Sequence, residues 1–433
     1  MKTISLPLLC SVLVLQLLEA EDWPEYQGAG RSNIWTEKAL PESFEGKELK
    51  TVWRSPVGPG YGGATIAGEC VLLMDRPDKQ HERVVCVDRE SGKQKWTHTY
   101  PCRYERVDYG YGPRACVTLS DGKAFSMGTM GHVHCLDAET GKVIWTRNLR
   151  SEYEVNIPIW GMTSSPLVVD DVVIVQAAAG SEGANILAFD KTSGKEKWRA
   201  FEDKAGYVSP ILIKQGGTPV VVAWTGERIA GINPSNGKVY WEIPTPPTRM
   251  PINVPGPVLN EDGTRMFLSV FYDGSKMISL NPAKPEANLL WKKAGINERK
   301  TKALHCMISP PVFIDNHVYG IDSYGQMRCL DAKTGERIWE DQKAVPMGRW
   351  ATVFMVRQAN TNRVWALNEL GELILARLTP KGYEEISRAK VIDPLTPLRQ
   401  RPGGVVLWVP PAFADGCLYI RNDKELVKVR IAK

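Results

Sequence analysis

The sequence predicts an all-β fold, an eight-bladed β-propeller built from four-stranded blades. A Trp-bearing segment recurs at intervals of 43 to 53 residues, which matches the length of one four-stranded blade. The 433 residues include 38 Gly and 30 Pro, which favours many turns and short strands over long helices. Finally, the first strand of the array has no partners and the last repeat lacks a fourth strand, so the two ends complement each other.

The recurring segment combines a strand, a turn and an outer strand that carries Trp. It reads Cys86-V-D-R-E-S-G-K-Q-K-Trp96, and the copy that ends at Trp291 has lost the Gly and gained two residues. Asp or Asn favours a turn, and Gly supplies its positive φ. Because Trp occurs once per repeat, we interpret the indoles as packing between blades, with each N–H bonded to a neighbouring backbone carbonyl. These docking residues are Trp53, Trp96, Trp145, Trp198, Trp241, Trp291 and Trp339.

Two degenerate copies complete the count of blades. One copy has Ile386 where Trp is expected, and the stretch from Pro411 supplies three strands without a fourth. Residues 49–55 supply a single outer strand. If this first strand completes the last blade, the ring has eight blades and no exposed edge. Seven blades is the alternative count.

The N-terminus has the pattern of an export signal. Lys2 precedes an apolar run of 15 residues, and Ala20 precedes two acidic residues. This predicts a signal peptide over residues 1–20, cleaved near Ala20. The run is shorter than the roughly 20 residues that a membrane helix needs, and an uncleaved anchor is the alternative. We therefore expect a periplasmic or secreted chain with a leader over 21–48 that packs on a propeller over 49–433, and no transmembrane span after cleavage.

Charge and metal-binding patterns exclude several classes of function. The net charge of +5 is spread along the chain, which does not indicate nucleic-acid binding. The nine Cys include no CxxC pair and no zinc spacing. Export permits disulfides, and Cys102 with Cys116 is a candidate pair. His132 and His134 share one face of a strand, but no third ligand is evident, and a packed or surface pair is the alternative.

The loops that precede the inner strands hold the candidate binding residues. Inner strands converge on the propeller axis, so these loops line the mouth of the channel. Aromatic rings beside two guanidinium groups predict a site for an anionic planar ligand, a sugar or a peptide. The alternative is that the aromatic side chains fill and seal the channel. The positions are Tyr61, Tyr111, Trp160, Tyr207, Asn253, His305, Trp350 and Trp408, with Arg114 and Arg349 beside two of them.

The repeat also resembles a known family. The pattern [AGC]-[LFVI]-[DN]-x-x-[TS]-G-K-x-x-W resembles the tryptophan-docking motif of quinoprotein-type propellers, named for pyrroloquinoline quinone (PQQ), over about residues 49–433. The leader segment Asp22-W-P-E-Y-Q-G resembles the opening of many secreted PQQ-like repeat proteins. The resemblance implies an eight-bladed propeller and two branches of function. One branch contains PQQ-dependent alcohol and sugar dehydrogenases, and the other contains BamB-like scaffolds that bind no cofactor and help assemble outer-membrane proteins.

The residues favour the scaffold branch. In the dehydrogenases the cofactor lies between a Trp and a disulfide of adjacent cysteines, above a calcium ion held by Glu and Asn. This sequence has no Cys-Cys pair, and Trp160 is the best candidate for the stacking residue. We therefore expect a monomeric, non-enzymatic scaffold that binds a protein partner or an envelope ligand, with no cofactor, metal or catalytic residue. Cys10 lies inside the apolar run, so the lipidation signal of BamB-like scaffolds is missing. A PQQ- and calcium-dependent dehydrogenase and a glycan-binding propeller are the alternatives.

Overall fold

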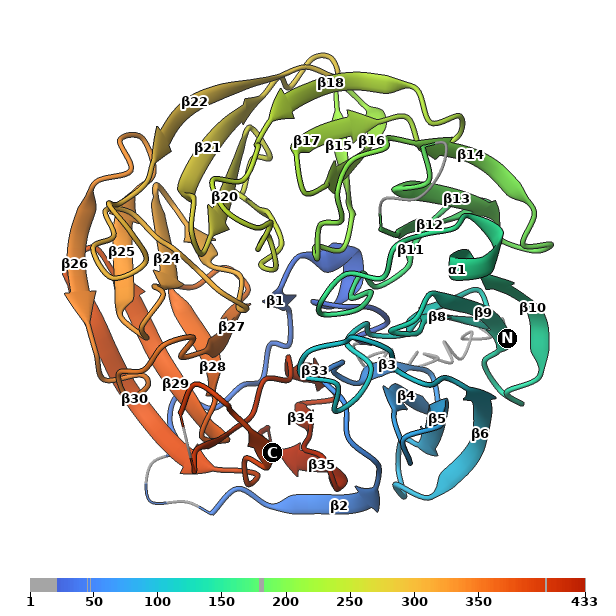
Figure 1. Cartoon of the computed structure of the whole chain (residues 1–433). Helices are drawn as coiled ribbons and strands as arrows, with labels where there is room; N and C mark the ends of the chain where they lie inside the picture. Colours follow the sequence, from blue (N-terminus) through green and yellow to red (C-terminus); the bar gives the residue numbers. More distant parts are fainter. Residues whose placement is uncertain (1–21, 45, 47, 179–182, 402, 433) are drawn as a thin grey trace, which may run out of the picture.

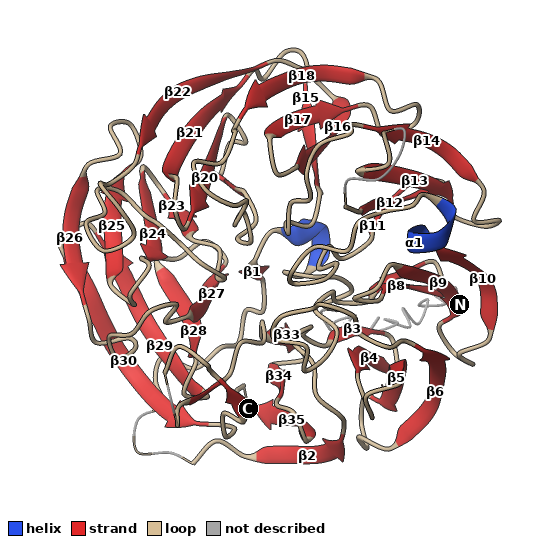
Figure 2. Cartoon of the chain, viewed as in Figure 1, coloured by secondary structure: helices blue, strands red, loops and turns tan. Residues whose placement is uncertain are grey.

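The computed structural model describes residues 22–44, 46, 48–178, 183–401 and 403–432 and shows eight β-sheets arranged in a ring (Figure 1). The predicted signal peptide lies outside these residues. Within them, helix is confined to the 3₁₀ turn η1 (Ala29–Arg31) and the single-turn α1 (Leu149–Glu152) (Figure 2). The prediction of an all-β, eight-bladed propeller is confirmed, and the alternative count of seven blades is wrong. None of the described helices is long and apolar enough to cross a membrane.

The first six blades each consist of four consecutive antiparallel strands. Blades 1 and 2 contain β3 (Thr65–Ala67), β4 (Cys70–Asp75), β5 (His81–Asp88), β6 (Gln94–Pro101), β7 (Thr118–Ser120), β8 (Lys123–Met127), β9 (His132–Asp137) and β10 (Val143–Asn148). Blades 3 and 4 contain β11 (Leu167–Val169), β12 (Val172–Gln176), β13 (Ile186–Asp190), β14 (Glu196–Ala200), β15 (Ile211–Gln215), β16 (Thr218–Trp224), β17 (Arg228–Ile232) and β18 (Val239–Pro244). Blades 5 and 6 contain β19 (Val258–Leu259), β20 (Arg265–Val270), β21 (Gly274–Leu280), β22 (Ala287–Lys293), β23 (Val312–Ile314), β24 (His317–Ile321), β25 (Met327–Asp331) and β26 (Arg337–Asp341).

The last two blades include strands from the N-terminal part of the chain. Blade 7 contains β27 (Val353–Gln358), β28 (Arg363–Asn368), β29 (Glu372–Thr379) and β30 (Gly382–Lys390), and the leader adds β1 (Ile34–Trp35) parallel to β27. Blade 8 contains β33 (Ala412–Ala414), β34 (Cys417–Arg421) and β35 (Glu425–Arg430), and β2 (Thr51–Pro56) pairs antiparallel with β35. A small hairpin, β31 (Thr396–Pro397) and β32 (Val405–Val406), lies between these blades in sequence. The first long strand thus completes the last blade, as predicted.

A β-bulge at the same place in every blade directs the outer strand. The register between the third and outer strands shifts in all eight blades, for example between Cys86 and Val87 opposite Trp96. A bulge adds local twist and redirects the side chain beside it. In seven blades that side chain is a docking Trp, which therefore reaches the next blade.

Six docking tryptophans donate their indole N–H to a carbonyl in the Asp/Asn turn or equivalent turn of the next blade. Donor–acceptor distances are 2.8–3.1 Å, and the acceptors of Trp53, Trp96, Trp145, Trp198, Trp291 and Trp339 are the carbonyls of Arg89, Ala138, Lys191, Pro234, Ala332 and Thr379. Gly92 shows why the turn needs glycine, because its φ is +68° and a Cβ there would lie 2.6 Å from the Trp53 ring.

Trp241 is the exception, and the sequence of the next blade explains it. Its indole donates to Oε1 of Gln215 at 2.9 Å. Gln215 in turn donates to the carbonyls of Asn281 and Glu286, which belong to the turn that has lost its glycine. The Gln215 side chain therefore connects Trp241 to blade 5 where the direct contact is absent.

The eight cysteines of the described chain are buried and free, so the candidate disulfide between Cys102 and Cys116 is wrong. Cys102 packs in the apolar cluster between blades 1 and 2, beside Glu82. The backbone N–H of Cys116 donates to Ser165, a residue of the channel lining. The two thiols thus lie in different environments, and sequence spacing could not reveal this.

Candidate binding site at the channel mouth

The loops that lead from each outer strand to the next inner strand meet at one end of the propeller axis, which we call the mouth. A cavity of about 150 Å³ lies there, and all eight of these loops contribute to its wall. Tyr26 of the leader lines it as well. The sequence-predicted residues that line the cavity are Tyr61, Arg114, Trp160, Tyr207, Trp350 and Trp408.

Aromatic side chains meet across the axis at the mouth. Trp350 precedes blade 7 and Trp160 precedes blade 3, on the opposite side of the ring, yet their ring centroids are 6.4 Å apart. Trp350 also lies 5.9 Å from Tyr109 and 6.2 Å from Trp408, in edge-on or tilted contacts that are favourable for aromatic pairs. Only 6% of Trp350 is exposed. The rings therefore fill much of the mouth and leave a small cavity.

Two polar groups in the cavity wall are buried without a hydrogen-bond partner. Within the described chain, neither Nε1 of Trp350 nor the hydroxyl of Tyr61 has one. Such groups are uncommon, because an unpaired buried donor costs free energy. Trp350 also has a φ of +65°, which is rare for a bulky residue. Its backbone N–H donates to the carbonyl of Ser323 at 3.0 Å. The mouth thus combines an unusual backbone conformation with unused hydrogen-bonding capacity.

The one charged residue in the described cavity wall, Arg114, is occupied by its own loop. Its guanidinium donates to the carbonyls of Asp108 and Tyr109 at 2.8 Å and lies 5.1 Å from the ring centroid of Tyr61. Burial raises the pKa of Tyr61 and raises the pKa of Tyr207 to about 12. Both phenols are therefore neutral near pH 7. The wall offers apolar area and neutral donors, with no group that titrates near neutral pH.

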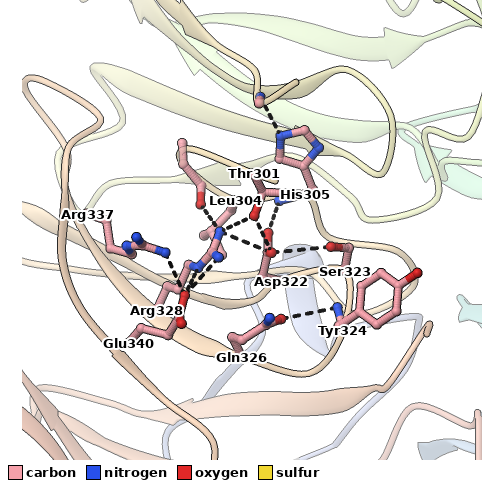
Figure 3. A network of polar contacts seen from close by, with 12 residues as sticks. Thr301, Leu304, His305, Asp322, Ser323, Tyr324, Gln326, Arg328, Arg337 and Glu340 are labelled. Atoms are coloured by element: carbon pink, nitrogen blue, oxygen red, sulfur yellow. Dashed lines mark hydrogen bonds and ion pairs between the residues drawn. The ribbon is translucent and has the colours of Figure 1, made fainter. Parts of the chain in front are cut away.

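His305 was expected at the mouth, and its position in the structure differs from that prediction. It is fully buried outside the cavity, where its Nδ1 lies 2.9 Å from the carbonyl of Phe271 and its Nε2 accepts the N–H of Gly295 at 3.1 Å. Its backbone N–H donates to Asp322 at 2.7 Å (Figure 3). Both ring nitrogens are thus used to hold the loop, and His305 is a structural residue.

Three other predicted positions also lie outside the cavity wall. Tyr111 points to solvent and Tyr109 occupies the wall in its place, because the chain adopts a left-handed conformation at Tyr109. Asn253 is buried and donates to the carbonyls of Trp224 and Thr225. Arg349 lies on the rim, 5.0 Å from the ring centroid of Trp350.

The leader closes the other end of the channel. The guanidinium of Arg31, in η1 at the centre of the ring (Figure 2), donates to the carbonyls of Pro166 and Pro210 at 2.5 Å and pairs with Glu25 at 2.7 Å. Trp35 packs 4.6 Å from Phe413 of blade 8, measured between ring centroids. The position of this plug in the channel could not be predicted from the sequence, because the leader has no repeat or periodic pattern that would place it.

The wall of the cavity does not fit a PQQ–calcium pair. Calcium sites in proteins use six to eight oxygen ligands, largely from carboxylates. No Asp or Glu is among the described residues that line the cavity, and no three His, Cys, Asp or Glu of the described chain are arranged to hold a metal.

The histidine pair on one strand has a third histidine beside it. The ring centroids of His98 and His134 are 4.8 Å apart, but burial lowers the pKa of His134 to about 3. His132 and His134 therefore form part of a packed, neutral cluster.

Comparison with known proteins identifies the family. The sequence model described as outer membrane protein assembly factor BamB matches residues 80–341, more than half of the chain. The chain belongs to this family of β-propeller proteins. No curated protein sequence gives a significant match.

Solved structures support the fold at low sequence identity. BamB from Moraxella catarrhalis is 14% identical with a TM-score of 0.57, and the alignment covers 88% of this chain and 100% of that chain. The quinohemoprotein alcohol dehydrogenase from Comamonas testosteroni is 15% identical with a TM-score of 0.66, covering 95% of this chain and 81% of that chain. The computationally designed Ika8 protein is 12% identical with a TM-score of 0.52, covering 90% of this chain and 100% of that chain. At these identities the likeness shows the fold alone.

Proposed function

We propose that this protein is a non-enzymatic scaffold of the cell envelope that binds a protein partner, and that it acts in outer-membrane assembly. The observation that carries the proposal is the filled mouth, where the rings of Trp160 and Trp350 meet across the axis. The family match to an outer membrane protein assembly factor supports the same reading. The export signal expected over residues 1–20 supports a mature chain that lies in the periplasm or outside the cell.

The chemistry of the cavity supports a binding role over catalysis. General acid–base catalysis needs a group whose pKa lies near the working pH. Burial raises the pKa of Tyr61 and Tyr207 far above this range, and Arg114 is held by backbone carbonyls. In the described wall of the cavity no Asp, Glu, His, Lys or Cys accompanies them.

Site-specific photocrosslinking in the cells that produce the protein tests the scaffold role. A photoreactive phenylalanine replaces Met347 or Tyr111 on the mouth face, Glu139 on the opposite face, or Leu290 on an outer strand. We expect a discrete protein adduct from one face, identified by mass spectrometry as a component of outer-membrane assembly, and none from Leu290. Failure of all four positions to give a protein adduct would overturn the proposal.

A titration of the purified chain with PQQ and calcium tests the alternative directly. We expect no saturable change in Trp fluorescence at micromolar cofactor. Saturable binding that Trp160→Ala abolishes would overturn the non-enzymatic assignment and justify an assay for alcohol oxidation. The Leu290→Ala variant, altered on an outer strand, controls for nonspecific effects.

A further inference from the structure

Two large apolar side chains are highly exposed on neighbouring mouth loops. Ile296, in the loop between β22 and β23, is 83% exposed, and Met347, in the loop between β26 and β27, is 69% exposed. These are the two highest values among the large apolar residues of the described chain. A single exposed apolar residue is ordinary on a protein surface. Whether two such residues on adjacent loops form a binding surface depends on the residues around them.

Tyr324 joins the two loops into one surface. It lies in the turn between β24 and β25, and its carbonyl accepts the N–H of Gly348 at 3.0 Å. Its hydroxyl accepts the Nε–H of Arg299 at 3.1 Å. Arg349, next to Gly348, contacts Trp350 and the hydroxyl of Tyr272, and its guanidinium lies 3.9 Å from a carboxylate oxygen of Glu298. We call the surface formed by Ile296, Arg299, Tyr324, Met347 and Arg349 the rim patch.

A buried polar network holds the rim patch in place. Asp322 accepts the hydroxyl of Thr301 and the backbone N–H of His305, both at 2.7 Å, and pairs with Arg328 at 3.0 Å (Figure 3). Arg328 also donates to the carbonyl of Ala303 at 2.8 Å. The loop that carries Ile296 and Arg299 is thereby anchored to blade 6. A surface that is ordered before binding loses less conformational entropy when a partner docks.

The charge of the mouth is uneven, and the rim patch lies on its basic side. The loops over 294–311 and 342–352 contain five Lys or Arg against one acidic residue, Glu298. On the opposite side of the mouth, the loops over 102–117, 149–166 and 201–210 contain five basic and six acidic residues. Like charges concentrated on one side favour a ligand of opposite charge. The occupant that complements this side is acidic.

We propose that the rim patch binds an acidic polypeptide segment of the partner protein. Ile296 and Met347 contact an apolar side chain of that segment, and Arg299 and Arg349 pair with its Asp or Glu carboxylates. Arg, Tyr and Met are enriched at protein–protein interfaces, where a few such residues carry most of the binding energy. The inference rests on the proposed scaffold function and adds the face that is used and the chemistry of the partner.

Fluorescence anisotropy with a labelled random copolymer of glutamate and tyrosine tests the rim patch on the purified mature chain. The copolymer supplies carboxylates and apolar rings together. We expect saturable binding that weakens as salt is raised, because exposed charges are screened. The double variant Ile296→Ser/Met347→Ser should weaken binding about tenfold, the effect expected when one or two anchor side chains are removed. Arg299→Gln/Arg349→Gln should weaken binding and reduce its dependence on salt.

Matched variants separate the rim patch from general surface effects. Leu289→Ser/Leu290→Ser removes two exposed apolar residues from β22, and Arg54→Gln/Arg377→Gln removes two exposed guanidinium groups from other strands. Neither should change the affinity. Equal losses in the control and rim variants, or binding that no rim variant changes, would overturn the proposal.

Other occupants give different results. Binding of anionic phosphatidylglycerol vesicles without binding of the copolymer would overturn the proposal in favour of a lipid surface. A dimer in light scattering that Met347→Ser dissolves would assign the rim patch to a second copy of the chain. A crosslinked partner at another face, with no copolymer binding, would overturn the rim patch and leave the scaffold role intact. Copolymer binding without any crosslinked protein would leave the rim patch and overturn the scaffold role.

Discussion

The two ends of the central channel are closed in opposite ways. At the mouth, aromatic rings from loops of different blades meet, and the Trp350 indole and Tyr61 hydroxyl have no partner in the described chain. At the other end, Arg31 of the leader is buried, and its guanidinium has a carboxylate and backbone carbonyls as acceptors. The buried charge at the leader end is therefore paired, although the indole N–H of Trp35 there also has no partner in the described chain. At the mouth the unpaired Trp350 indole and Tyr61 hydroxyl belong to residues that line a cavity, so the mouth is the end suited to binding.

The largest effect is expected from Arg31→Met, which keeps the length of the side chain but removes its charge and donors. Glu25 would lose its ion-pair partner, and the carbonyls of Pro166 and Pro210 would lose the guanidinium that donates to them. Removing one partner of a buried ion pair costs about 3–5 kcal/mol, and we expect the free energy of unfolding to fall by about 4 kcal/mol. Urea denaturation measures it.

The control for this prediction is Arg54→Met, at an ion pair with Glu425 on the exposed surface. Exposed pairs contribute roughly 0–1 kcal/mol, so this variant should unfold almost like the parent chain. If the two variants lost the same stability, the leader would not be an essential closure of the channel.

Trp350 should show a smaller effect at the mouth, with a distinctive order among its variants. Trp350→Ala removes a ring that packs on Trp160 and Trp408. Trp-to-Ala changes in packed sites lower the free energy of unfolding by about 3–5 kcal/mol. Because Trp350 adjoins a cavity, we expect a loss of about 3 kcal/mol. Because φ is +65°, a Cβ at this position is strained by about 1–2 kcal/mol, so Trp350→Gly should be the more stable of the two variants. Urea denaturation of both tests it. A less stable Gly variant would show that the backbone is not strained.

The contrast between the ends also explains what the sequence could predict. The docking tryptophans and the closure by residues 49–55 follow a repeat whose chemistry is local: a turn, a glycine and a ring. Trp241 departs from the pattern because its acceptor, Gln215, compensates for a glycine missing from the next blade. A contact that depends on a loss elsewhere in the chain has no signature in its own repeat.

The aromatic character of the mouth could be predicted from the sequence, but not every residue that lines it. Loops before inner strands must reach the axis, so an aromatic wall could be inferred, and six of the predicted residues lie in it. Loop conformation decided the remaining positions, since Tyr109 and Tyr111 differ by two residues and only one faces inward. The leader has no period at all, so the role of Arg31 depends on contacts with carbonyls far away in sequence.

Acid should loosen the mouth and leave the leader end unchanged. Burial lowers the pKa of His305 below its usual value of 6.5; nearby Asp322 and Asp273 oppose this shift and Arg328 adds to it. Below pH 6.5 the folded state therefore binds fewer protons at His305 than the unfolded state does. The stability that neutral His305 contributes is fully present above pH 6.5 and is lost as the pH falls below this value. The loss is at most about 1.4 kcal/mol per pH unit. Hydrogen exchange at pH 7 and pH 5 should show increased opening of residues 294–305 relative to 22–35.

The control for the acid effect is His305→Gln, because the glutamine side chain does not titrate at this position. In this variant, after correction for the intrinsic exchange rate, the difference in hydrogen exchange between residues 294–305 and residues 22–35 should be the same at pH 7 and pH 5. Equal opening of both segments in the parent chain would mean that acid acts on the whole fold rather than on the mouth.

The smallest effect on stability is expected at the rim patch, which sharpens the distinction between closing the mouth and using it. Ile296 and Met347 are mostly exposed, so Ile296→Ser/Met347→Ser removes little buried area and should change the free energy of unfolding by less than about 0.5 kcal/mol. Urea denaturation measures this on the same preparation used for copolymer binding. A variant that binds weakly and unfolds normally separates recognition from folding, whereas a stability loss comparable to that of Trp350→Ala would place these residues in the closure itself.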